Sequence, residues 1–172
     1  MSQQTQNLMK KISLAKVVLN MGIGKSGEPI EIGKKTLAQI TGKKPNTRNA
    51  KKSLRDWGVR KGEPIGVAVT VRGNDATELL KKLLVVKDNQ IAEKAFDNEG
   101  NLSFGIKEHI DIPGIKYDPR IGILGLEVSI SLARPGFNIK FNKSKAKVGK
   151  NHRITKNDAI KFLTEEFGVK VV

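Results

Sequence analysis

The stretch PIGVAVTVR, Pro64–Arg72, shows the clearest strand pattern in the chain. Every second residue from Ile65 to Val71 is apolar and β-branched, which is typical of a strand that buries one face. The intervening residues are small or polar and occupy the opposite face; they are Gly66, Ala68, Thr70 and Arg72. The stretch therefore predicts a strand with one apolar and one polar face.

Three further segments carry strand patterns. Leu14–Met21 is rich in aliphatic and β-branched residues and is followed by glycines. Leu102–Ile110 also predicts a strand, and so does Ile121–Ala133, where apolar residues alternate from Leu124 to Leu132. We expect an irregular connection, Pro113–Pro119, between the last two strands.

Two helices are predicted between these strands. Ile30–Thr41 carries spaced apolar residues, and a helix is expected to open near Pro29 and to end at Gly42. Asn74 is expected to cap a second helix. The spacing of four leucines in that helix buries one stripe; they are Leu79, Leu80, Leu83 and Leu84.

A final helix is predicted after Thr155, because Asp158 three residues later resembles a capping arrangement and Gly168 is a C-terminal stop signal. Its inner face would carry Ile160, Leu163 and Phe167. Strands interleaved with helices indicate an α+β fold, with a mainly antiparallel sheet, helices packed on one face and an extended basic loop between strands. We expect one domain, 1–172, with a flexible loop at about 49–62 and a basic extension at about 134–153.

The charge of the chain is strongly positive and unevenly distributed. Lys and Arg number 32 against 17 Asp and Glu, so the formal net charge is +15. Residues 34–72 carry eleven basic and two acidic side chains, and residues 134–153 carry seven basic ones and no acid. Two such patches favour a polyanionic partner, nucleic acid before an anionic membrane. No apolar run approaches the ~20 residues of a membrane span, and cysteine is absent, which fits a cytosolic setting.

A glycine motif, GIGKSG at Gly22–Gly27, follows the first predicted strand. Glycines in this pattern let backbone amides approach a pyrophosphate at the start of a helix. However, Pro29 follows, and no acid that could bind a ribose lies between Glu31 and Asp56. A flexible turn is the favoured interpretation. The alternative is a nucleotide-dependent RNA-processing enzyme that uses this turn.

The remaining ionisable residues form no enzyme signature. The two histidines, His109 and His152, are 43 residues apart and offer no local metal-binding spacing. We expect His109 to be structural and His152, between basic residues, to meet phosphate. Three nearby acids are best interpreted as solvated side chains; they are Glu108, Asp111 and Asp118. We therefore expect no catalysis, no metal and no cofactor.

The segment 43–62 combines Lys and Arg with Asn, Thr and Ser, the side chains that contact phosphate and sugar oxygens. Its one aromatic residue, Trp57, could stack on an exposed base or pack under a hairpin tip, and packing is slightly favoured. The whole chain is only 5% aromatic and lacks the aromatic strand motif of the common RNA-recognition sheet. Recognition of folded RNA through its shape and backbone is therefore favoured over the reading of unstacked bases.

Five stretches of the chain resemble one protein family. They are Val17–Gly24 (VVLNMGIG), Leu37–Ser53 (LAQITGKKPNTRNAKKS), Lys61–Gly73 (KGEPIGVAVTVRG), Phe96–Pro119 (FDNEGNLSFGIKEHIDIPGIKYDP) and His152–Thr155 (HRIT). Together they are similar to large-subunit ribosomal protein five, the universal family that binds 5S rRNA. EHIDIPG and the segment RPG that opens the basic extension resemble the archaeal form.

The resemblance implies a structural role in the large ribosomal subunit. It places the 5S rRNA-binding residues at Asn20, Lys43, Thr70 and Arg72. Bacterial members often have Gln at the position of Lys43, so a lysine–phosphate contact is the expectation there. The resemblance also implies anchoring of 5S rRNA in the central protuberance, contact with large-subunit rRNA, and contact with neighbouring ribosomal proteins, one of them a small-subunit protein across the intersubunit bridge.

The same resemblance implies that the exposed loop at about Asn49–Gly62 reaches P-site tRNA. The residues expected to face the tRNA are Arg48, Lys51, Lys52, Arg55, Trp57 and Arg60. The protein is thus expected to be a cytoplasmic, ribosome-bound RNA-binding protein with no membrane partner.

Overall fold

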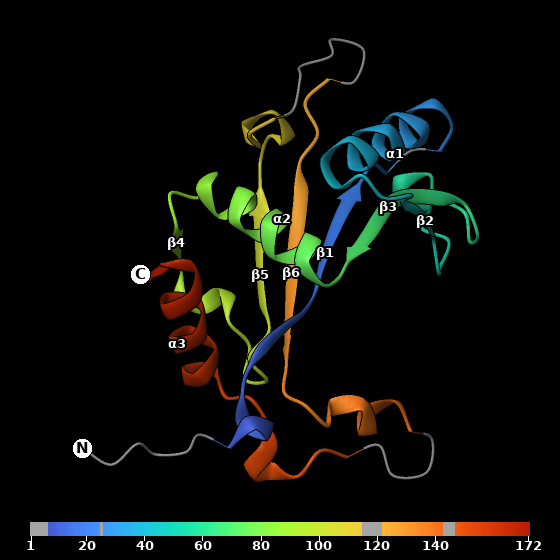
Figure 1. Cartoon of the computed structure of the whole chain (residues 1–172). Coiled ribbons are helices and arrows are strands. Elements are labelled where there is room, and N and C mark those ends of the chain that lie inside the picture. The colour runs from blue at the N-terminus through green and yellow to red at the C-terminus, as the bar shows by residue number, and fades with distance from the viewer. Residues whose placement is uncertain (1–6, 25, 115–121, 143–146) are drawn as a thin grey trace.

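Figure 1 shows the computed structural model, which describes residues 7–24, 26–114, 122–142 and 147–172. Within these residues, five strands form one sheet in the order β2-β3-β1-β6-β5, and every neighbouring pair is antiparallel. The five strands are β1 (Ser13–Gly22), β2 (Asn46–Asn49), β3 (Pro64–Val71), β5 (Leu102–Ile106) and β6 (Leu126–Ala133). Two short strands pair in parallel, β4 (Gln90–Ile91) with β7 (Lys170–Val171).

Three α-helices of the described part of the chain cover the apolar face of the sheet. They are α1 (Glu28–Thr41), α2 (Asn74–Val85) and α3 (Lys156–Phe167). Alternate residues of the central strands are fully buried, and they form one core cluster with leucines of all three helices. Residues of opposite parity point away from this core, as the pleat of a strand requires. The predicted α+β fold with a mainly antiparallel sheet is confirmed.

The predicted helix ends are correct with one exception. Gly42 and Gly168 both adopt the left-handed conformation that ends a helix. Thr155 and Asp158 form a complete capping box at the start of α3. The prediction that Asn74 caps α2 is wrong. Gly73, with φ 71°, takes the cap position, and Asn74 is the first helical residue.

The predicted strands differ from the structure at their ends. The short strand β2 was not predicted, because its residues, NTRN, show no apolar alternation. Strand β5 ends at Ile106 rather than continuing to Ile110, and β6 begins at Leu126. Much of the predicted connection Pro113–Pro119, and Ile121 of the predicted last strand, lie outside the described residues.

His109 is structural, as expected, although it lies in a short 3-10 helix rather than in a strand. Its side chain is 1% exposed, and its Nδ1 accepts a hydrogen bond from the backbone N–H of Leu124 at 3.3 Å. The backbone N–H of His109 donates in return to the Leu124 carbonyl at 3.1 Å. These bonds hold the segment before β6 against the segment after β5.

Candidate nucleic-acid interface

The face of the sheet opposite the helices is polar, and strand register aligns its side chains in rows. One row crosses the whole sheet: Asn46 pairs with Ala68, Ala68 with Asn20, Asn20 with Glu127, and Glu127 with Gly105. Directly paired residues of adjacent strands point to the same face. The next row contains Thr70, Val18, Ser129 and Ser103. We call this surface the open face.

Three of the predicted 5S rRNA-binding residues gather at one end of β3. Thr70 is exposed on the open face, and Arg72 is exposed directly after the strand. Lys43 lies between α1 and β2, and its Nζ is 2.7 Å from Oδ2 of Asp75 in the first turn of α2. This ion pair brings Lys43 to the end of β3, since Asp75 closely follows Arg72 in the chain. The fourth residue, Asn20, is half-buried near the middle of the open face.

The Lys43–Asp75 pair also changes the charge that this end of the sheet presents. The hydrogen bond from Lys43 and its positive charge hold the pKa of Asp75 below its usual range. The carboxylate is therefore ionised at neutral pH and compensates the lysine charge. Arg72 has no such acidic partner among the described ion pairs.

The β2–β3 loop leaves the opposite end of β3 and is internally bonded. Leu54 and Val59 form an isolated antiparallel bridge, closed by a 3-10 turn and by Gly58 with φ 64°. Glu63 accepts hydrogen bonds from the Ser26 hydroxyl at 2.6 Å and from the Arg60 backbone N–H at 3.0 Å. These bonds, the one from Ser26 first, lower the pKa of Glu63. These contacts close the tip of the loop and tie its base to the segment before α1.

Most predicted tRNA-facing residues project from this loop. Lys51, Lys52, Arg55 and Arg60 are all exposed. Trp57 is 76% exposed, so the slightly favoured interpretation that it packs under the hairpin tip is wrong. Arg48 lies in β2 rather than in the loop, opposite Gly66, and therefore belongs to the open face. Its neighbour Asn46, which was not predicted as a site residue, shares that face.

Part of the second basic stretch is used for structure. The Arg134 side chain is 11% exposed, and its guanidinium donates to Asp158 Oδ2 at 3.0 Å and to the Arg153 carbonyl at 3.1 Å. His152 donates from Nε2 to the Pro135 carbonyl at 2.8 Å, so the expectation that it meets phosphate is wrong for this nitrogen. Lys147 and Lys150 are exposed, and residues 143–146 of the extension lie outside the described residues.

Comparison with known proteins identifies the family to which this chain belongs. The family model Ribosomal protein L5 matches residues 7–60, and the model of the C-terminus of the same ribosomal family matches residues 64–162. The chain belongs to the ribosomal protein L5 family. It is 64% identical to the large ribosomal subunit protein uL5 of Nitrosopumilus maritimus over 172 residues, 99% of each chain. It is also 58% identical to uL5 of Cenarchaeum symbiosum over 165 residues, which are 95% of this chain and 98% of the relative. Identity to uL5 of Sulfolobus acidocaldarius is 45% over 168 residues, 97% and 94% of the two chains.

Membership of the ribosomal protein L5 family confirms several predictions made from the sequence. The chain is a structural protein of the large ribosomal subunit and not an enzyme, and it is located with the ribosome in the cytoplasm. The three relatives named above come from archaea, in agreement with the predicted archaeal form. The family also accounts for the excess of positive charge, since ribosomal proteins associate with RNA.

The alternative of a nucleotide-dependent RNA-processing enzyme is wrong, and the structure gives a physical reason. Helix α1 begins at Glu28, and its first turn carries Glu28 and Glu31 where a phosphate would need positive potential. Lys25 of the glycine motif lies outside the described residues. No group of three His, Asp or Glu residues within the described ranges is arranged to hold a metal ion.

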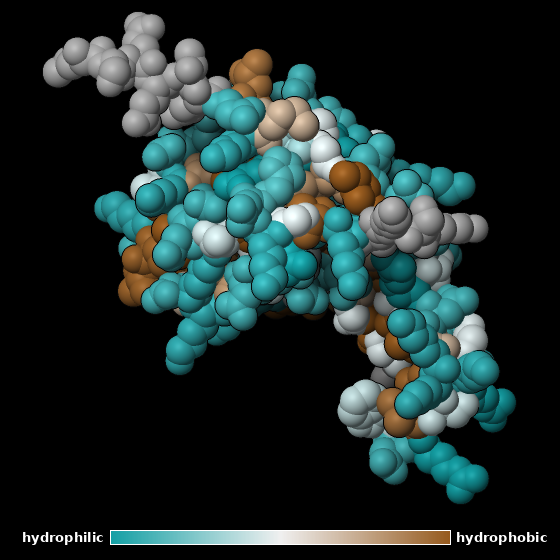
Figure 2. All heavy atoms as spheres, turned by 90° about the horizontal axis from the view of Figure 1, so that it is seen from below, coloured by the Kyte–Doolittle hydropathy of each residue, from teal (hydrophilic) through white to brown (hydrophobic). Residues whose placement is uncertain are grey.

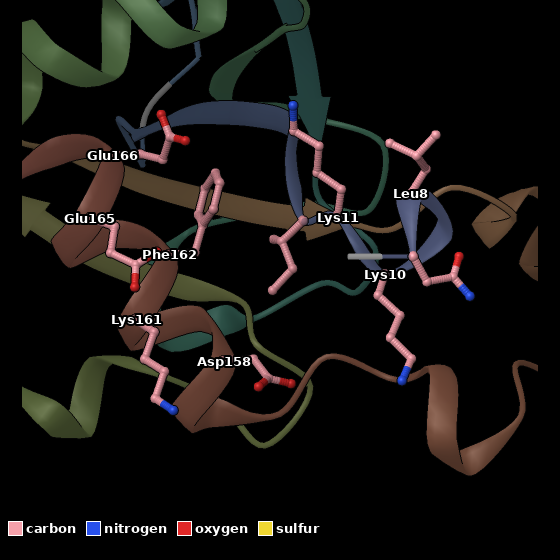
Figure 3. Close-up of a pocket in the computed structure, with 10 residues that line it drawn as sticks. Leu8, Lys10, Lys11, Asp158, Lys161, Phe162, Glu165 and Glu166 are labelled. Carbon is pink, nitrogen blue, oxygen red and sulfur yellow. The ribbon is translucent and has the colours of Figure 1, made fainter. Parts of the chain in front are cut away.

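The rest of the surface of this ribosomal protein L5 family member carries both acidic and basic side chains. A hollow of about 910 Å³ lies between the N-terminal segment and α3 (Figure 3), with Lys10 and Lys11 on one side and Glu165 and Glu166 on the other. The molecule viewed from below is largely hydrophilic, with scattered hydrophobic side chains (Figure 2). None of the helices in the described part of the chain is long and apolar enough to cross a membrane.

Proposed function

We propose that the protein binds 5S rRNA through the open face and contacts P-site tRNA through the β2–β3 loop. The observation that carries this proposal is the position of the two basic groups at opposite ends of β3. Lys43, Thr70 and Arg72 lie at one end of the strand, and the loop leaves the other. Eight strand residues span roughly 25 Å, so the two surfaces can engage two RNA molecules at once.

The open face would bind 5S rRNA through two kinds of contact. Arg72 neutralises phosphate, which supplies salt-dependent affinity, and Lys43 contacts phosphate while Asp75 offsets most of its charge. Asn20 and Thr70 donate and accept hydrogen bonds and fix the orientation of the RNA. Arg48 and Asn46, which strand pairing brings to the same face, join this group in the proposal.

The loop would reach tRNA through four of its exposed cations, Lys51, Lys52, Arg55 and Arg60, and through Trp57. An exposed indole in a basic surface is suited to stacking on an unpaired base. We also propose that the protein anchors 5S rRNA in the central protuberance, where large-subunit rRNA and neighbouring ribosomal proteins, including a small-subunit protein across the intersubunit bridge, are further partners. The chain would do this as a single domain, 1–172, with its basic extension.

Paired alanine variants test this division of labour. Asn20→Ala and Arg72→Ala should weaken binding to isolated 5S rRNA and leave binding to tRNA unchanged. Lys52→Ala and Arg55→Ala should do the reverse. Filter binding of each variant to both labelled RNAs measures the two affinities. If all four variants behaved alike towards each RNA, the proposal of two separate surfaces would be wrong.

A further inference from the structure

One acidic residue stands at the centre of the open face. Glu127 lies in β6, directly paired with Asn20 of β1 on one side and with Gly105 of β5 on the other. Its neighbours along the strand, Leu126 and Val128, are buried in the core, so Glu127 points to the open face and is exposed. The position belongs to the rigid centre of the sheet and not to a loop.

The charge of Glu127 is unlike that of the surface around it. Glu127 is the single acid among the described strand residues of the open face. The other charged residues of these strands on this face are Lys16 and Arg48, and the rest are neutral. The structure gives the Glu127 carboxylate no hydrogen bond and no ion pair within the described residues. A negative charge at this position weakens the binding of a polyanion to the open face, because it repels phosphates within a Debye length of ~8–10 Å.

A carboxylate accepts hydrogen bonds and donates none. RNA offers donors only at base edges and at 2′-hydroxyl groups, so the carboxylate favours an RNA that turns one of these toward it. The Watson–Crick edge of guanine presents two parallel donors, N1–H and N2–H, which match the two oxygens of a carboxylate. The neighbouring side-chain amide of Asn20 can donate to the adjacent O6 acceptor of the same base.

The other neighbour of Glu127 leaves room for a base. Gly105 has no side chain, and a Cβ built there would meet nothing within 4 Å. The surface beside the carboxylate is therefore open on the side of β5. Ser103 and Ser129, paired in the next row, add hydroxyl groups at the border of this space.

We propose that Glu127, Asn20 and Gly105 form a site for the Watson–Crick edge of an unpaired guanine in the bound RNA. The site deepens the proposed function, because it rests on RNA binding to the open face. The guanine site would make binding selective for a base, whereas the cations of the open face would provide affinity for phosphate. Phosphate contacts carry no sequence information, whereas a bidentate contact to a base edge discriminates between bases.

The substitution Glu127→Gln tests the site, because it removes the charge while keeping size and shape. A glutamine presents an amino group where guanine also presents a donor, so one of the two hydrogen bonds is lost. We expect at least fivefold weaker binding to 5S rRNA, because a contact that discriminates the base loses one of its two hydrogen bonds. Binding to an unrelated RNA hairpin should stay constant or become up to about threefold tighter, because a repulsive charge is gone. Glu78→Gln, an equal charge change on the exposed surface of α2, should affect both RNAs equally.

A second measurement reads the base directly and does not require that 5S rRNA is the partner. Amide chemical shifts of Asn20, Gly105 and Glu127 are followed while the wild-type protein is titrated with the pentanucleotides UUGUU, UUIUU and UUAUU. Inosine lacks the N2 amino group, so we expect the guanine oligonucleotide to bind most tightly, and we expect this preference to vanish in Glu127→Gln.

The outcomes separate the site from the proposed function. If Glu127→Gln tightened binding to both RNAs by the same factor, Glu127 would only repel phosphate and the guanine site would be wrong. Equal titrations by all three pentanucleotides would overturn it as well. If the wild-type protein instead failed to prefer 5S rRNA over the hairpin but still selected guanine, the site would stand and the 5S rRNA proposal would fall.

Discussion

The ion pair between Lys43 and Asp75 leads to an unusual prediction: removing an acid should strengthen RNA binding. The pair is tight, with 2.7 Å between Nζ and Oδ2, and it lies at the end of β3 among the proposed 5S rRNA contacts. In this state Lys43 contributes little net positive charge to the surface. Asp75→Asn leaves the lysine free to neutralise a phosphate.

The expected magnitude follows from counterion release. One additional phosphate contact steepens the plot of log affinity against log salt concentration by about 0.7–0.9 units. Between 50 and 200 mM salt this corresponds to about a threefold difference in affinity. The gain in 5S rRNA affinity of Asp75→Asn over the wild type should therefore be about threefold larger at 50 mM salt than at 200 mM. Fluorescence anisotropy with labelled 5S rRNA at several salt concentrations measures both the affinity and the slope.

A double-mutant cycle provides the control. Lys43→Met leaves Asp75 unpaired near the RNA, so it should weaken binding, while the double variant should resemble the wild type. Both side chains of the pair are substantially exposed, at 38% and 65%, so the thermal unfolding midpoint should change little. If Lys43→Met and Asp75→Asn each left the salt slope unchanged, Lys43 would not lie at the RNA interface.

Three further predictions concern stability, stacking and pH. Thr155→Ala should destabilise the protein by about 1 kcal/mol, because α3 loses its N-terminal cap. Asp158→Ala should destabilise it by about 2–3 kcal/mol, because this change also leaves the nearly buried Arg134 guanidinium without its carboxylate partner. Equal losses of unfolding free energy for the two variants in urea would contradict this. Trp57→Ala should leave stability within about 0.5 kcal/mol of the wild type, since the indole is 76% exposed. The same variant should weaken tRNA binding by about 1–3 kcal/mol if the indole stacks on a base, and an unchanged affinity would exclude stacking. The pKa of Glu63 is lowered in the folded loop, so its contribution to loop stability should be complete above its ordinary pKa of 4.5 and should disappear as the pH falls through the lower folded value. Amide hydrogen exchange in the loop should show this loss of stability at acidic pH in the wild type and not in Glu63→Gln.

Most of the fold could be predicted because its signals are local. The strand Pro64–Arg72 shows the alternation that one-sided burial produces, and the capping box at Thr155 is a pattern of closely spaced residues. Strand β2 could not be predicted in this way, because its pairing with β3 is made by the backbone and its side chains are polar. The two-residue strands β4 and β7 depend on each other although they lie far apart in the chain, and they leave no pattern of their own.

The candidate site was only partly predictable for a related reason. Thr70 and Arg72 share a strand, so alternation placed them together. Asn20 and Glu127 lie side by side through strand register, which depends on the topology of the whole sheet. The pairing of Lys43 with Asp75 links the segment after α1 to the start of α2. Arg48 was predicted to face tRNA from the loop, but its position in β2 places it on the open face. Charge counts located the basic stretches but not the acids placed among them.

The central position of β1 has a consequence for the order in which the chain acquires its function. β1 is synthesised first among the strands, yet both of its partners, β3 and β6, come later in the chain. Sheets with such non-local pairing form slowly, because loop closure must precede the contacts that stabilise it. The row that joins Asn20 to Glu127 exists only after β6 has docked. A nascent or misfolded chain therefore lacks the complete surface, and selective RNA capture would serve as a check that folding has finished.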